Sequence, residues 1–381
     1  MDVKAPVVLL RAFAELKDPR MNRTKLHSLT DILGIAILAV ICGADGWAQV
    51  AKFGRCKLKW FKTFLELPNG IPSHDTFGRV FAALEPSAFE ECFMKWVSAL
   101  TTASAGRFIA IDGKTIRRSL DTASDKAAIH MVNAWCQANH MVLGQLATDA
   151  KSNEITAIPE LMKLLDLKGA VVTIDAAGCQ KKIAQQIVEQ GGDYLLQLKG
   201  NQGTLHDETV TLFDQCLTDD CRGIAYSTAA TTDKGHGRIE QRRLWATSEV
   251  NWFAEKGKWK NLRSLIRVRR QRTLGEKTSD EYHYYISSLP ADNASKLLKY
   301  VRGHWGVENN LHWCLDISFA DDQRRARKGN AAENFARLSR IAMNLLKLQT
   351  KHKAGLKRKR LCAGWDAQYL LNVLTQLQNE L

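Results

Sequence analysis

The sequence lacks both a cysteine framework and an apolar run long enough to cross a membrane. Its nine cysteines are scattered and include no C-x-x-C pair, which argues against a zinc site or a disulfide scaffold. The longest apolar run, Ile32 to Cys42, falls well short of the ~20 residues of a spanning helix. The N-terminus also lacks the basic-then-apolar layout of a signal peptide. We therefore expect a reduced, cytoplasmic protein with no membrane association.

Acidic residues are in short supply relative to basic ones. The chain has 40 Asp and Glu against 54 Lys and Arg, a formal net charge of +14. Such an excess favours polyanionic partners, of which nucleic acid is the commonest, and a generic basic surface is the alternative. With 381 residues and 45% hydrophobic content, the chain has enough apolar material for two or three domains.

The pattern of apolar and polar residues changes near residue 103. Residues 1–102 show helical patterning and predict a helical N-terminal domain. Beyond them, short β-branched runs alternate with helical segments, an order typical of a mixed α/β sheet. Residues 203–290 break that order and predict a mainly β insertion, with strands over Arg238–Thr247, Leu262–Thr273 and Glu281–Ser287. After it helices return, including a long one over Ala331–Leu348. The strands expected before the insertion are Phe108–Ile111, Ala127–Gln137, Met141–Thr148, Val171–Ile174 and Tyr194–Leu198.

Two of these apolar runs end on an aspartate followed by small residues. Asp112 closes Phe-Ile-Ala-Ile, and Asp175 closes Val-Val-Thr-Ile. Open α/β sheets place their sites at strand ends, and carboxylates gathered there imply a bound cation. Two Mg²⁺ ions held by such carboxylates suit chemistry on phosphates. The alternative is that each aspartate only caps a turn.

Far downstream, Glu308 lies in the first turn of a predicted helix flanked by tryptophans. Its spacing from His312 and Asp316 puts the three residues on one helical face. His312 is either a phosphate contact or a structural hydrogen-bonding group. Asp316, Asp321 and Asp322 also lie close in sequence, so the pattern alone leaves the third carboxylate open between them and Glu308.

Taken together, these residues resemble the H-repeat-associated bacterial insertion-sequence transposases, a branch of the DDE class with an RNase H-like catalytic domain. The resemblance runs through nearly the whole chain. The matching segments are His74-Asp-Thr-Phe-Gly-Arg-Val-Phe, Ile111-Asp-Gly-Lys-Thr115, Val172-Thr-Ile-Asp175-Ala, Leu198-Lys-Gly-Asn-Gln202, Gly235-His-Gly-Arg-Ile-Glu240 and Arg302-Gly-His-Trp-Gly-Val-Glu308-Asn.

The resemblance implies a DNA transposase whose catalytic domain spans residues 103–381. Asp112, Asp175 and Glu308 are its implied metal-binding catalytic triad, with two Mg²⁺ ions that Mn²⁺ can replace. The implied reaction is cleavage at the element ends followed by 3′-hydroxyl strand transfer into double-stranded target DNA, with a homodimer in the synaptic complex. The alternative is a catalytically inactive, transposase-derived DNA-binding protein. A Mg²⁺ nuclease unconnected to transposition is a third interpretation.

The sequence departs from the wider DDE class around the glutamate. Many members carry Tyr, Arg and Lys at positions that here hold Val301, His304 and Leu315. His304, Arg302 or Lys114 are the expected substitutes in contacting phosphate.

Several basic runs flank the acidic positions, among them Arg267–Arg272, Arg324–Lys328 and Lys357–Arg360. Each alone is compatible with a solvated charged face. Together they favour a DNA channel, since cations neutralise phosphates without reading sequence. The predicted DNA contacts are Lys114, Arg117, Lys199, Asn201, His236, Arg238, Arg302, His304 and His312.

Overall fold

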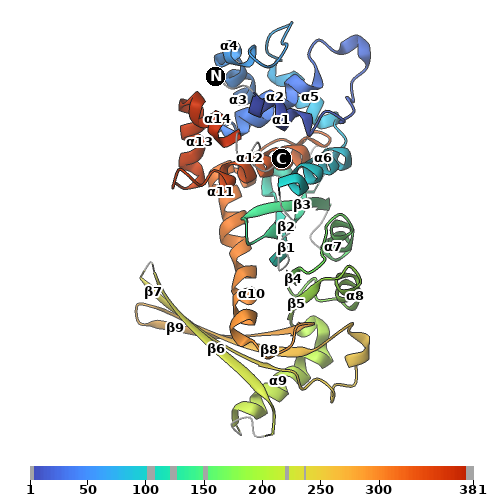
Figure 1. Ribbon diagram of the computed structural model, residues 1–381, viewed down its shortest axis with the longest axis vertical. Helices are drawn as coiled ribbons and strands as arrows, with labels where there is room; N and C mark the ends of the chain where they lie inside the picture. Colours follow the sequence, from blue (N-terminus) through green and yellow to red (C-terminus); the bar gives the residue numbers. More distant parts are fainter. Residues whose placement is uncertain are drawn as a thin grey trace. The chain divides into compact units, whose positions relative to one another are not determined.

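The computed structural model describes residues 4–100, 108–120, 127–148, 153–218, 223–235 and 237–374. The chain forms two compact units. The first, here called the helical unit, comprises Met1–Ser104, Gly113–Asn153 and Glu308–Leu381. The second, the sheet unit, comprises Ala105–Asp112 and Glu154–Val307. Figure 1 identifies the elements of each.

The sheet unit is built on a mixed sheet. Its strands follow the order β1-β4-β5-β9-β8-β7-β6, with β1, β4 and β5 parallel and β9, β8, β7 and β6 antiparallel. The long antiparallel strands form a ribbon visible in Figure 1. The strands are β1 (Phe108–Thr115, whose last residues belong to the helical unit), β4 (Val171–Ile174), β5 (Asp193–Leu198), β6 (Tyr226–Gly235), β7 (Arg238–Thr247), β8 (Ser264–Leu274) and β9 (Lys277–Ser287).

Among the described residues, the first two helices of this unit lie in the connections between its parallel strands, as parallel pairing requires. The third helix follows the last parallel strand after a short turn, and the fourth follows the β ribbon. They are α7 (Glu154–Lys163), α8 (Lys181–Glu189), α9 (Gly203–Thr218) and α10 (Ala294–Val307), with short 3₁₀ turns η4 (Gly200–Gln202) and η5 (Lys256–Lys258).

The helical unit combines N-terminal and C-terminal helices with a β hairpin. The hairpin strands are β2 (His130–Cys136) and β3 (Met141–Thr148), paired antiparallel. The helical elements are α1 (Lys4–Arg11), η1 (Asn22–Thr24), α2 (Leu29–Ile41), α3 (Trp47–Cys56), α4 (Leu58–Phe61), α5 (His74–Ala83), α6 (Pro86–Leu100), η2 (Arg117–Ser119), η6 (Glu308–His312), α11 (Trp313–Phe319), η7 (Asp321–Gln323), α12 (Ala331–Leu348), α13 (Leu356–Trp365) and α14 (Ala367–Leu374).

Capping residues explain where the N-terminal helices begin. The Ser28 hydroxyl accepts a 3.0 Å bond from the Asp31 amide at the start of α2. Ser73 does the same for Thr76 at the start of α5, at 3.2 Å. A serine in this position satisfies one of the orphan amides of the first turn. Both caps stabilise helices that carry buried apolar faces.

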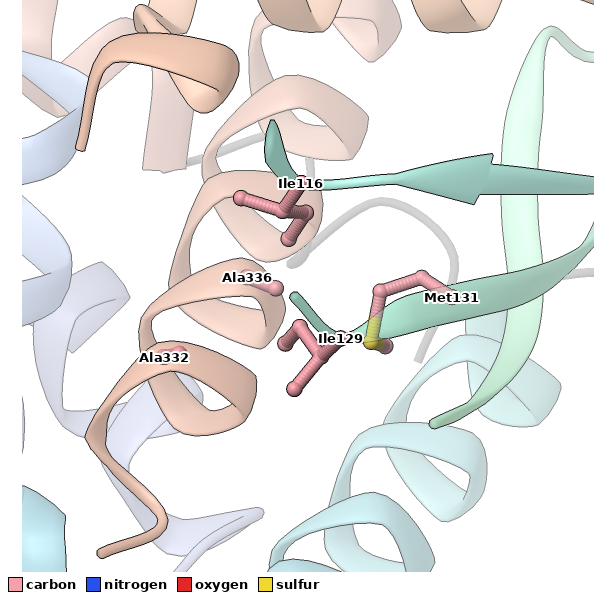
Figure 2. Close-up of a cluster of buried hydrophobic side chains, with 5 residues drawn as sticks. All are labelled: Ile116, Ile129, Met131, Ala332 and Ala336. Carbon is pink, nitrogen blue, oxygen red and sulfur yellow. The ribbon is translucent and has the colours of Figure 1, made fainter. Parts of the chain in front are cut away.

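Helix α12 is the centre of the helical unit. Nearly all its side chains are buried, and it contacts α2, α5 and β3. One cluster of buried side chains joins the helix to the hairpin (Figure 2). Small alanines on α12 leave room for the larger side chains of the neighbouring strands. The cluster consists of Ile116, Ile129, Met131, Ala332 and Ala336.

The β insertion is present, and it contains one strand more than the pattern indicated. β7, β8 and β9 lie where strands were expected, and β6 pairs with β7 along its whole length, from Tyr226↔Thr247 to Gly235↔Arg238. Its sequence, YSTAATTDKG, has little apolar alternation because much of the strand is exposed. Among the described residues, no helix has the length and apolarity needed to span a membrane.

Candidate active site

Asp112 and Asp175 lie next to one another in register at one edge of the sheet unit. β1 and β4 are parallel, and Ile111 pairs with Ile174, so the residue that follows each is an aspartate. The strand residues before them are buried, whereas both aspartates are partly exposed. β4 ends before Asp175 as predicted, whereas β1 continues through Asp112 to Thr115, four residues beyond the predicted end at Ile111. Asp112 therefore lies within its strand, beside the carboxyl end of β4, the kind of position where open α/β sheets place their sites. The structure therefore brings together these two predicted site residues.

The backbone of the loop after β4 holds the Asp175 carboxylate. Its Oδ1 atom accepts bonds from the amides of Ala177 at 3.0 Å and Gly178 at 3.3 Å, a turn that aspartate side chains favour. A Cβ at Gly178 would come within 2.2 Å of the Ile174 side chain. Glycine is thus required for this turn to pack against its own strand.

The segment after β5 supports the same loop from the side. Asn201 donates a 2.7 Å side-chain bond to the Ala176 carbonyl, and Gln202 donates one of 3.0 Å to the Cys179 carbonyl. Asn201, a predicted DNA contact, therefore has a positioning role in the loop of Asp175. Lys199 is exposed in this segment and is free to face a phosphate.

Helix α10 packs along β1 and β4. A Cβ at Gly303 would come within 2.1 Å of the Phe108 ring, so glycine allows a close approach there. The rings of Tyr300 and Phe108 are 5.3 Å apart. One helical turn after Tyr300, the Nδ1 atom of His304 lies 2.9 Å from the hydroxyl oxygen of Thr173. Thr173 is two residues before Asp175. Successive turns of α10 therefore follow the strands towards the edge that carries the aspartates.

Burial makes His304 a neutral side chain. Removal from water lowers the pKa of its imidazole to about 4, and the nearby Asp175 charge acts in the opposite direction without cancelling it. Thr173 fixes the ring orientation. His304 stands where the wider DDE class has an arginine, and it can contribute hydrogen bonds but no positive charge at neutral pH.

Arg302, another predicted DNA contact, is engaged within the sheet unit. Its guanidinium lies 2.7 Å from the Asp233 carboxylate on β6. Arg242 on β7 reaches the same carboxylate oxygen at 2.8 Å. This ion-pair bridge ties α10 to the β insertion, and part of the Arg302 charge is neutralised by it.

Arg238 belongs to a second ion-pair group on the insertion. The buried Glu240 carboxylate lies 2.8 Å from Arg242 and 2.6 Å from Arg270, and 4.0 Å from the more exposed Arg238. Burial acts to raise the pKa of Glu240, and these guanidinium groups lower it by more. His236, also predicted to contact DNA, lies outside the described residues.

In the helical unit, Glu308 opens a π-helical turn, η6. Its side chain is exposed, whereas Val307, Leu311 and Leu315 are fully buried. Single π turns inside helices are uncommon and recur at functional sites. The turn is a local feature that the sequence pattern did not indicate.

Lys114 is buried in ion pairs within the helical unit. Its ammonium lies 2.7 Å from Asp316 and 3.2 Å from Asp322, and only 7% of its surface is exposed. Arg117 lies beside Asp322 at 3.4 Å with its side chain largely exposed. Of these two predicted DNA contacts, Arg117 is therefore the accessible one.

His312 and Asp321 belong to a buried polar cluster. Asp321 is fully buried, with Arg324 at 2.8 Å and Arg340 at 3.2 Å. Burial, with the charges of Lys114 and Arg340 adding to it, lowers the pKa of His312 to about 3. The structure thus places His312 among structural polar groups, which was one of its two interpretations.

The donor set at the strand edge suits a divalent cation. Asp112 and Asp175 supply carboxylate oxygens, the ligands that Mg²⁺ prefers, and the exposed Lys199 directly follows β5, the parallel neighbour of β4. Across the described parts of the chain, no three His, Cys, Asp or Glu side chains are grouped closely enough to hold a metal ion by themselves. The pair is compatible with an open site that substrate phosphates complete.

Three residues with structural roles were not predicted from the sequence. Thr173 interrupts an otherwise apolar strand, and this polar interruption was the available signal. Asp233 and Glu240 carried no local signal, because their arginine partners lie on other strands and on α10.

A mixed sheet with two aspartates side by side on adjacent parallel strands, and with a β insertion before a later glutamate, is typical of a nucleic-acid phosphoryl-transfer domain of RNase H-like class. Two family models match the chain, "DDE_Tnp_1-associated" over residues 10–97 and "Transposase DDE domain" over residues 103–345. The chain therefore belongs to the DDE transposase family, with H repeat-associated transposases among its relatives. The predicted fold class is confirmed.

Several curated relatives match almost end to end. "Putative transposase YncI" of Escherichia coli O157:H7 is 41% identical over 370 residues, 96% of this chain and 94% of that protein. "H repeat-associated putative transposase YhhI" of Escherichia coli K12 is 40% identical, covering 96% and 97%. A shorter relative, "Inactive transposase YbfQ" of the same strain, is 47% identical over 63 residues, 16% of this chain and 75% of that protein. Transposases act on DNA, and DDE domains use divalent metal ions.

Proposed function

We propose that this transposase cleaves DNA at the ends of its own element and joins the resulting 3′-hydroxyl to target DNA. Asp112, Asp175 and Glu308 are the proposed metal ligands, and Mg²⁺ is the proposed ion, two per site. The observation that carries the proposal is the register of Ile111 with Ile174, which aligns two aspartates at one strand edge.

The course of α10 supports Glu308 as the third ligand. The helix follows β1 and β4 in their own direction, because Tyr300 lies beside Phe108 at the start of β1 and His304, one turn later, lies beside Thr173. Glu308 follows the last residue of α10 directly in the chain and is exposed. Of the competing acidic residues, Asp316 and Asp322 already pair with Lys114, and Asp321 is buried between two arginines. This leaves Glu308 as the best candidate.

The divalent ions, when bound, would activate a water or 3′-hydroxyl and stabilise the leaving oxygen. The protein orients its own ligands: backbone amides and Asn201 fix the Asp175 loop. Neutral His304, held by Thr173, orients without adding charge. Lys199 is the proposed phosphate contact on this edge, since cations at such sites counter the charge of the backbone.

The test is cleavage and strand transfer on duplexes carrying the element ends, with Mg²⁺, with Mn²⁺ and with chelator. Asp112→Asn, Asp175→Asn and Glu308→Gln should each lower the cleavage rate by on the order of 10³-fold or more. Asp207→Asn, an exposed carboxylate on α9 of the same unit, is the matched control and should cleave normally.

Two results would contradict the proposal in different ways. Full metal-dependent cleavage by any of the three variants would remove that residue from the ligand set. Tight DNA binding by the unaltered protein, with no cleavage under either metal, would instead favour the inactive DNA-binding alternative. Cleavage without strand transfer would indicate a nuclease.

A further inference from the structure

Helix α13 buries cationic residues and exposes apolar ones. Lys359 and Arg360 are 7% and 4% exposed, whereas Leu361 and Trp365 are 42% and 74% exposed. This is the reverse of an ordinary surface helix, in which the apolar stripe faces the core. An exposed tryptophan therefore lies on the outer face of this helix, where packing within the unit does not use it.

The buried cations have internal partners. Lys359 donates to the carbonyl of Leu346 at 3.0 Å and to that of Gln349, at the end of α12. Arg360 donates to the Val40 carbonyl at 2.8 Å, near the end of α2. Cations at helix C-termini satisfy orphan carbonyls and complement the helix dipole. Because both side chains are bonded to the protein's own carbonyl groups, their charges are unavailable to a ligand.

The exposed residues of the helix form one outward face. At about 100° per residue, Lys357, Leu361, Trp365 and Arg358 fall within an arc of about 100°. All four are exposed. The face therefore combines two cations with an aliphatic and an indole side chain.

Two more exposed lysines, Lys351 and Lys353, lie in the segment that leads into α13. Lys351, Lys353, Lys357 and Arg358, together with Trp365, are called here the C-terminal basic surface. No ion pair joins any of its four cations to an acidic side chain in the described part of the chain. Elsewhere, exposed lysines such as Lys95 and Lys163 do have carboxylate partners. Within the described residues, the four charges are thus uncompensated.

We propose that the C-terminal basic surface binds DNA, its cations contacting backbone phosphates and Trp365 stacking on an unpaired base. Cations without protein partners release counterions from DNA when they bind phosphate, and an exposed aromatic ring is a stacking platform for bases. The family matches end at residues 97 and 345, so this surface lies beyond the matched catalytic domain. The inference rests on the proposed function only in that DNA is the substrate.

The charge arm of the test measures the affinity of the full-length protein for a duplex of arbitrary sequence, without metal, over a range of salt. In the variant, Lys351, Lys353, Lys357 and Arg358 are all changed to Gln. We expect binding roughly tenfold or more weaker, and a slope of log affinity against log salt reduced by about two to four. The control changes Lys25, Lys95, Lys163 and Lys258 to Gln, since each lies beside a carboxylate. This control should shift affinity and slope far less.

The stacking arm compares single-stranded and duplex probes. Trp365→Ala should weaken binding of single-stranded DNA roughly tenfold and duplex binding less, because stacking needs an accessible base face. Trp252→Ala, which removes another exposed tryptophan in the sheet unit, is the matched control. Thermal melting of every variant establishes that it is folded, as expected for exposed positions.

Two outcomes would overturn the inference. Equal salt slopes for the surface variant and its control would show that these cations do not contact phosphate. A Trp365→Ala protein with unchanged DNA affinity and an altered oligomeric state in light scattering would make this face a contact between copies. Neither result bears on the cleavage test, because Asp175→Asn protein should bind DNA normally in the same assay.

Discussion

Asp175 and Asp321 are both carboxylates close to the ends of regular elements, and their surroundings differ in the charge that faces them. Asp175, at the strand edge of the sheet unit, is partly exposed and accepts bonds from backbone amides. Asp321, in the polar cluster of the helical unit, is fully buried between two guanidinium groups. A carboxylate held by neutral amides keeps its charge for a cation, whereas one enclosed by arginines serves the fold. The same residue type thus divides by its partners into a proposed catalytic role, for Asp175, and a structural role, for Asp321.

The largest expected effect is on catalysis at the strand edge. Asp175→Asn should lower the cleavage rate by on the order of 10³-fold, a barrier increase of about 4 kcal/mol, with little change in melting temperature. Parallel cleavage and thermal melting assays measure both quantities. A strongly lowered melting temperature would break the comparison, because it would make Asp175 structural like Asp321.

Asp321→Asn should act on stability instead. Removing one partner of a buried ion pair leaves an uncompensated charge and costs about 3–5 kcal/mol, here with Arg340 and Arg324 left behind. Urea unfolding of the variant and of the Asp207→Asn control gives the difference in free energy. An unchanged midpoint would show that the cluster is far less enclosed than the structure indicates.

Acid should destabilise both regions through one histidine each. The pKa of His304 is lowered to about 4 and that of His312 to about 3, against about 6.5 in the unfolded chain. The unfolded state therefore binds protons first, and stability falls as pH drops below 6.5, by up to about 1.4 kcal/mol per pH unit for each histidine. Unfolding free energies measured across this range give the slope.

Replacing one histidine tests which region contributes. His312→Asn should reduce the slope of unfolding free energy against pH by about half, between pH 6.5 and the pKa of His312 in the folded protein. His304→Asn should reduce the slope by a similar amount, down to the pKa of His304 in the folded protein. A slope that neither variant changes would assign the acid sensitivity to other groups.

The smallest effect is expected at the Arg302–Asp233 bridge. Both side chains are partly exposed, 37% and 46%, and ion pairs of this kind contribute roughly 0.2–1 kcal/mol. A double-mutant cycle with Arg302→Gln and Asp233→Asn measures the coupling. A coupling energy near that of a buried ion pair would show that this bridge stabilises the contact between α10 and the insertion more than its solvent exposure indicates.

The parallel core of the sheet could be predicted from the sequence because local signals determine it. Val171–Ile174 and Tyr194–Leu198 were expected as strands; β4 has the first of these bounds, and β5 begins one residue earlier than the second, at Asp193. The paired aspartates follow from two such strands lying in register. Helix α12, Ala331–Leu348, likewise has the predicted bounds, since its apolar periodicity is continuous.

The partners of the charged residues could not be predicted, because they are distant in sequence. Arg267–Arg272 and Lys357–Arg360 look alike as basic runs. In the structure, Arg267 pairs with Asp214 and Arg270 with Glu240, while Lys357 and Arg358 keep their charges exposed. Lys114 and Arg302 also found acidic partners that no local pattern indicated. The triad and the DNA contacts remain predictions.

The π-helical turn at Glu308 has a consequence for comparing this chain with distant transposases. In a regular helix, the seventh residue after the glutamate completes two turns and returns to its face. A wider turn delays that return, so the seventh residue, Leu315, points into the core and is fully buried. Asp316, one position later, carries the polar contact, and its partner Lys114 comes from β1. Alignments that hold a lysine at a fixed interval after the glutamate will therefore look for it on the wrong side of this helix.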